Sequence, residues 1–154
     1  MLFVRWISAP TASPEPRPRF ALAPSSRAML AAIASVFLEG ALPVGAESSA
    51  ARTETLAAIE QAISGLPPAT REELAELFSL LEFAPTRCLV AGVWSPWEEA
   101  SNTSVAAFLD RWRDSRFALL RSAYGALHQI VFGAWYAQPS AWPPTGYAGP
   151  PEVS

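Results

Sequence analysis

The stretch TREELAELFSLL, residues 70–81, is the clearest structural signal in the chain. Thr70 stands three residues before Glu73, which is the spacing of a capping box at a helix start. Apolar residues then follow at helical offsets on one face. They are Leu74, Leu77, Phe78 and Leu81. The stretch therefore predicts an amphipathic helix that buries one face against the rest of the protein.

The same period extends outward in both directions from this helix. Upstream, a stripe spaced three, four and three residues apart predicts a helix that ends at Gly65, before Pro67-Pro68. Its members are Leu56, Ile59, Ile63 and Leu66. We also expect a first helix over 27–39 with Ser25 or Ser26 as its cap, a short helix near 86–92, and two helices or one bent helix over 104–137. No segment alternates with period two, so the predicted fold is all-α, a compact bundle of five or six helices.

Residues 28–38 form the longest apolar run, which is well short of the ~20 residues of a membrane-spanning helix. One interpretation is a secretory signal, with Arg27 before the run and a small-residue cleavage site at Val44-Gly45-Ala46. The other is a helix of the mature fold, which the spacing of the larger apolar residues favours. These are Met29, Ile33, Val36 and Phe37. We adopt the second interpretation.

Proline divides the chain into three parts. Residues 1–25 contain five prolines after an apolar opening and predict a disordered tail or the remnant of a leader. Residues 26–137 form the predicted helical domain. Residues 138–154 combine five prolines with Trp142 and Tyr147, and we expect an extended segment that lies either across this domain or across a partner.

Composition excludes several classes of protein. The 154 residues fit one domain, and 51% apolar with 16% charged residues is too apolar for a disordered protein. The net charge is −3 and every basic residue is Arg, so we expect no nucleic-acid partner. A single cysteine, Cys88, and a single histidine, His128, exclude an internal disulfide framework and a multi-histidine metal centre.

Few residues are suited to catalysis. His128 is the one general-base candidate of ordinary pKa, and Tyr124 lies one helical turn before it, but a packing role is the commoner one. Cys88 follows Arg87, which favours a thiolate only if the thiol is exposed; a small buried side chain is the simpler interpretation. Glu98 and Glu99 are adjacent, so their carboxylates point apart. We therefore expect no catalytic residue, no metal and no cofactor in this chain.

The second half of the chain is unusually rich in aromatic residues and arginine, the residue types enriched in protein–protein hot spots. Arginines between the aromatic residues either form a solvated face or bond backbone carbonyls or a partner's carboxylates. The hypothesis that follows is a partner-binding surface. Its candidate residues are Trp94, Trp97, Arg111, Trp112, Arg113, Arg116, Trp135, Tyr136, Trp142 and Tyr147.

Several motifs in this half resemble a known group of proteins. They are Trp94-Ser95-Pro96-Trp97, Arg111-Trp112-Arg113-Asp114-Ser115, Ala134-Trp135-Tyr136, and Trp142 followed by Gly146-Tyr147-Ala148-Gly149-Pro150-Pro151. The chain from about Ala28 to Pro151 resembles bacterial periplasmic proteins with twin-arginine leaders, which are similar to the small third subunit of gluconate 2-dehydrogenase complexes.

The resemblance implies a non-catalytic accessory subunit, or an assembly and export partner, of a membrane-associated dehydrogenase. The large subunit, a flavoprotein of the glucose-methanol-choline type, would hold the FAD. The resemblance also implies a periplasmic location. The chain has no Arg-Arg pair, so the leader would lie upstream or belong to a partner, or the protein would stay in the cytoplasm. The alternative function is a stand-alone helical ligand-binding protein or enzyme with a pocket around His128.

Overall fold

The computed structural model describes residues 22–42, 45 and 47–139, and these residues contain helices and no strand. The all-α prediction is confirmed. The elements in chain order are α1 (Pro24–Phe37), α2 (Glu47–Ser64), α3 (Pro68–Glu82), α4 (Ala84–Thr86), the π-helix η1 (Arg87–Ala91), the 3₁₀-helix η2 (Trp97–Glu99), α5 (Asn102–Arg113) and α6 (Ala118–Tyr136).

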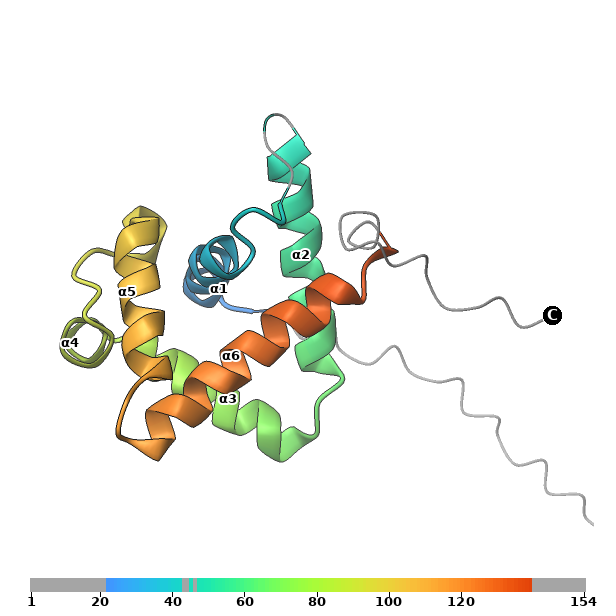
Figure 1. Ribbon diagram of the computed structural model, residues 1–154. Coiled ribbons are helices and arrows are strands. Elements are labelled where there is room, and N and C mark those ends of the chain that lie inside the picture. The colour runs from blue at the N-terminus through green and yellow to red at the C-terminus, as the bar shows by residue number, and fades with distance from the viewer. Residues whose placement is uncertain (1–21, 43–44, 46, 140–154) are drawn as a thin grey trace, which may run out of the picture.

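Helix α1 lies at the centre of the molecule, where it contacts α2, α3, α5, α6 and η2 (Figure 1). Its residues Met29, Leu30 and Ile33 are fully buried. Burial of a Leu, Ile or Met side chain contributes roughly 1.5–3 kcal/mol. The apolar run 28–38 is therefore a core helix of this fold, as its spacing predicted. No helix in the described part of the chain is long and apolar enough to span a membrane.

The start of α1 differs from the prediction. The helix begins at Pro24, a residue type that suits the first turn because its φ is already helical, and the N-cap Ala23 makes no side-chain bond. Ser25 donates its hydroxyl to Glu82 at 2.9 Å, and Ser26 also donates to that carboxylate. The predicted serine cap is thus wrong, because both hydroxyls bond the end of α3 instead. Leu22 already belongs to the core, so packing starts before residue 26.

The start of α3 also differs, whereas its buried face is as predicted. The helix begins at Pro68 with Pro67 as N-cap and no side-chain cap bond, so the predicted capping box of Thr70 and Glu73 is wrong. The Pro-Pro pair fixes helical φ values and moves the N-cap three residues earlier, from Thr70 to Pro67, so Thr70 becomes part of the first turn. The buried residues are Leu74, Phe78 and Leu81, on the predicted stripe.

Residues 102–136 form two helices. Helix α5 is capped by Ser101, whose hydroxyl accepts the Ser104 N–H at 3.2 Å. After a turn at 114–117, α6 runs diagonally across α2 in Figure 1 and buries Leu127, Val131 and Trp135. Residues 1–21 of the predicted tail 1–25, and residues 140–154 of the predicted segment 138–154, with Trp142 and Tyr147, lie outside the described residues.

Candidate functional site

The aromatic candidates for partner binding divide by exposure. Trp97, Trp112 and Trp135 are buried among this chain's own apolar residues. Trp94 is 76% exposed and Tyr136 is 52% exposed. Trp94 and Tyr136 can therefore contact a partner at the surface. Trp97, Trp112 and Trp135 instead stabilise the core.

The two buried indoles near Trp94 donate hydrogen bonds to carbonyls of the preceding helices. Trp97 Nε1 donates to the Leu81 carbonyl at 2.9 Å, and Trp112 Nε1 donates to the Val90 carbonyl at 3.2 Å. Carbonyls at a helix end have no partner within the helix, so these bonds satisfy groups that burial would otherwise leave unpaired. The indoles thereby fix the end of α3 and η1 against α5 and η2.

Arg111 makes a similar bond. Its guanidinium donates to the Ala91 carbonyl, the last residue of η1. It lies over Gly92, which has a φ of +67° and so adopts a left-handed conformation that other residues rarely adopt. The sequence allowed the arginines to bond either backbone carbonyls or the carboxylates of a partner. Arg111 bonds a backbone carbonyl of its own chain.

The other arginines of this region lie on the exposed side of the α5–α6 turn. Arg113 pairs with Asp110 at 3.1 Å and with Asp114 at 3.0 Å. The hydrogen bond and positive charge of Arg113 lower the pKa of the Asp114 carboxyl. Arg116 stacks over Phe117 with its guanidinium carbon 4.9 Å from the ring centroid. The positive charge of Arg113 is thus paired with two carboxylates of this chain. Arg113 and Arg116 both remain exposed to solvent.

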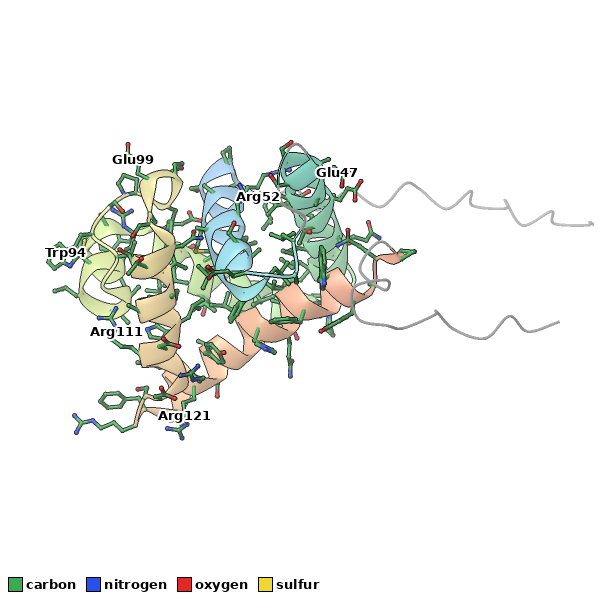
Figure 2. The ribbon with its side chains drawn as sticks, turned by 45° about the horizontal axis from the view of Figure 1, so that its top comes forward. Glu47, Arg52, Trp94, Glu99, Arg111 and Arg121 are labelled. Carbon is green, nitrogen blue, oxygen red and sulfur yellow. The ribbon has the colours of Figure 1, made fainter. Side chains whose placement is uncertain are left out.

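Five large apolar side chains are exposed within residues 80–94, where the elements α3, α4 and η1 contact one another. We call this group the 80–94 surface; its members are Leu80, Phe83, Leu89, Val90 and Trp94. Leu89 is 82% exposed, and Figure 2 shows Trp94 pointing outward at the edge of the molecule. Apolar side chains that gather on one surface in this way are typical of protein-binding sites.

The 80–94 surface continues along α3 as an open depression of about 600 Å³. Its lining residues are Ala75, Glu76, Ser79, Leu80 and Phe83. Beneath the surface, Ala91 and Val93 are fully buried, and the Val93 N–H donates to the Arg87 carbonyl at 3.1 Å. The exposed side chains therefore stand on a backbone that is already fixed, which reduces the entropy lost on binding.

The catalytic candidates occupy ordinary structural positions. The His128 ring packs 4.4 Å from Phe132 and 5.4 Å from Phe37, measured between ring centroids. Tyr124 lies 6.0 Å from it, so the predicted proximity is confirmed as ring packing. The Cys88 thiol is half-buried and free. Within the described ranges, no group of three or more His, Cys, Asp or Glu side chains is placed to hold a metal ion.

Sequence reasoning missed four of the five members of the 80–94 surface. Leu80 lies off the apolar stripe of α3, so a large apolar residue on the polar face was a signal available in the sequence. Leu89 and Val90 gave no such signal, because their exposure depends on η1. This π-helix buries Ala91 and exposes Leu89 and Val90. π-Turns of this kind occur often at functional sites.

Comparison with known proteins identifies no relative. No family model matches the chain, and no curated protein and no solved structure matches it.

Proposed function

We propose that this protein is an accessory subunit of an FAD-dependent dehydrogenase and binds the flavoprotein large subunit through the 80–94 surface. The observation that carries the proposal is the exposure of five large apolar side chains within residues 80–94, on a backbone fixed by Trp97, Arg111 and Trp112. The resemblance of the Trp- and Arg-containing motifs to the gluconate 2-dehydrogenase small subunit supports the choice of partner. FAD and the oxidation of substrate belong to that partner.

The geometry favours a contact of the kind found at protein–protein hot spots. Trp94 offers a large ring at low entropic cost, and Leu89 and Phe83 of the same surface expose further apolar area. Truncating a hot-spot residue costs about 2 kcal/mol or more, which is roughly a 30-fold loss of affinity. Arg113 and Arg116 are exposed at the α5–α6 turn, and exposed charges of this kind affect the rate of association more than its strength.

The test is co-purification with a flavoprotein of the glucose-methanol-choline type encoded next to this chain. We expect a stable complex, and we expect Leu89→Ser and Trp94→Ser each to weaken it by about 30-fold. Leu119→Ser is the matched control, because Leu119 is 78% exposed but lies at the start of α6, outside the 80–94 surface. Isothermal calorimetry or surface plasmon resonance measures the three affinities.

Two results would contradict the proposal. One is the absence of any complex with such a flavoprotein. The other is a complex that Leu119→Ser weakens as much as Leu89→Ser does, since general loss of apolar surface would then explain the effect. Periplasmic location after twin-arginine export of the folded complex belongs to the same proposal, and fractionation of cells that express both subunits tests it.

A further inference from the structure

The turn between α5 and α6 exposes apolar and basic side chains within one short stretch. Phe117 is 56% exposed and Leu119 is 78% exposed. Arg113, Arg116 and Arg121 are exposed in the same nine residues. We call these five residues the 113–121 surface. Figure 2 shows Arg121, in the first turn of α6, at the opposite edge of the molecule from the labelled glutamates.

The backbone of the 113–121 surface is held by bonds within the turn. The Phe117 N–H donates to the Ser115 hydroxyl at 3.1 Å, and Arg121 Nη1 donates to the Ser115 carbonyl at 2.6 Å. Leu120, the residue after Leu119, packs against the core. The turn is therefore ordered with the Phe117 and Leu119 side chains outside, so little conformational entropy is lost when something covers them.

The charge of this stretch is opposite in sign to that of the whole chain. Residues 110–121 contain four of the eleven arginines and two of the fourteen acidic residues, so the stretch has a net charge of +2 in a chain of net charge −3. Asp110 and Asp114 both pair with Arg113. Arg116 and Arg121 make no ion pair with any described residue. Their charges therefore attract an anionic surface.

The 80–94 surface lacks this combination. Residues 80–94 contain one arginine, Arg87, and one glutamate, Glu82, and Glu98 and Glu99 follow shortly after them. Arg87 is half-buried, and its Nε donates to the Val93 carbonyl at 3.3 Å. Charge therefore directs an anionic surface to the α5–α6 turn and not to the 80–94 surface.

We propose that the 113–121 surface binds membranes that contain anionic phospholipids. Phe117 and Leu119 would enter the interface, where aromatic and leucine side chains of peripheral proteins lie. Arg116 and Arg121 have long aliphatic stems, so their guanidinium groups reach the lipid phosphates. The proposal concerns a different surface from the proposed subunit contact and does not depend on it.

An acidic protein would attract the same arginines, but the shape of the turn favours a membrane. A stable protein interface buries about 800 Å² on each partner. The 113–121 surface offers only two large exposed apolar side chains, Phe117 and Leu119. A bilayer interface accepts a small projecting turn, because lipids need no complementary shape.

The test is co-sedimentation of the full chain with vesicles made of equal parts phosphatidylglycerol and phosphatidylcholine, and with vesicles of phosphatidylcholine alone. We expect binding to the anionic vesicles at about 0.1 M salt and little binding at about 1 M salt, because the screening length falls from about 10 Å to about 3 Å. Binding to the neutral vesicles should be roughly 25-fold weaker, since each of two arginines near an anionic surface contributes about fivefold.

Three substitutions test the individual contacts on anionic vesicles. Arg116→Gln should weaken binding about fivefold through the lost charge. Phe117→Ser and Leu119→Ser should each weaken it roughly tenfold through the lost apolar area. Phe117 is the N-cap of α6, a position that favours serine, so Phe117→Ser keeps the start of that helix.

Two matched controls lie outside the turn. Arg52→Gln removes an exposed arginine of α2, and Tyr136→Ser removes a ring that is 52% exposed at the other end of α6. Neither should change vesicle binding, and the helical circular dichroism of every variant verifies folding.

Four results would overturn the proposal. They are no binding to anionic vesicles, equal binding to neutral vesicles, control variants that weaken binding as much as the turn variants do, and turn variants that leave vesicle binding unchanged. If those last variants instead weaken binding to the flavoprotein subunit, the turn contacts an acidic protein and not a membrane.

Discussion

Gly92→Ala tests whether Gly92 and Arg111 act as one unit beneath the 80–94 surface. Gly92 is the C-cap of η1 and has a φ of +67°. A Cβ added there would lie 2.6 Å from Arg111 Nη1 and 2.8 Å from Arg111 Cζ. The guanidinium is the end of a flexible side chain, so it can move away. Once it moves, it no longer donates to the Ala91 carbonyl.

The expected magnitude has two parts. A non-glycine residue in the left-handed region costs roughly 1–2 kcal/mol. Loss of the Arg111 bond costs about 1 kcal/mol, because Arg111 is exposed and water partly replaces the charged donor. Gly92→Ala should therefore lower the free energy of unfolding by about 2–3 kcal/mol, and Arg111→Met alone by about 1 kcal/mol.

The two substitutions should not be additive. In the double variant the guanidinium is already absent, so its bond is lost only once and the total remains about 2–3 kcal/mol. The coupling free energy is then about 1 kcal/mol, which urea unfolding followed by tryptophan fluorescence can resolve. Arg111→Met keeps most of the aliphatic stem, so the cycle reports mainly on the guanidinium.

A coupling free energy within about 0.3 kcal/mol of zero would refute this reasoning. Substitutions at independent sites have free-energy changes that are additive to within about this value. It would mean that the strain at Gly92 and the Arg111 bond are unrelated. A Gly92→Ala variant as stable as the unaltered chain would refute the left-handed conformation itself.

Two further predictions concern the neighbouring side chains. Trp97→Phe removes the indole donor from the buried Leu81 carbonyl and should lower the free energy of unfolding by about 2 kcal/mol in urea titrations. Trp94→Phe, at an exposed position, should leave the free energy of unfolding unchanged. Equal effects of the two substitutions would contradict the assignment of Trp97 to the core. Arg113 lowers the pKa of Asp114, so ionised Asp114 stabilises the fold above its ordinary pKa of 3.8, and that contribution is lost as the pH falls through the lowered pKa. The stability difference between the unaltered chain and Asp114→Asn, measured by thermal melts across pH 2–7, should therefore shrink at the acid end, and a difference that grows there would reverse the sign.

Helical period predicted the buried faces well, because burial of an amphipathic helix depends on the spacing of its own side chains. Leu74, Phe78 and Leu81 of α3 and Met29 and Ile33 of α1 are buried as the pattern indicated. Helix starts were predicted less well. The serine and threonine caps gave way to Pro24 and to Pro67-Pro68, since proline fixes φ without any partner and a hydroxyl can bond elsewhere.

Composition was enough to name the candidate partner-binding residues, but it did not show which of them are exposed and which are buried. Trp94 and Trp97 stand in one short motif, yet one ring is exposed and the other is buried with its N–H on Leu81. The difference depends on η1, which packs against α3, and on η2, which packs against α1 from a distant part of the sequence. Likewise, no local rule indicated that Arg111 bonds the Ala91 carbonyl, twenty residues before it.

The amino-acid sequence by itself determined that this chain is helical, and it determined which face of each long helix is apolar, since both properties depend on residues within a few positions of one another. Only the tertiary structure decided which tryptophans are core and which are surface, and which apolar side chains gather on the 80–94 surface. Exposure is a property of the packed helices together, because a side chain is buried only when residues from elsewhere in the chain cover it.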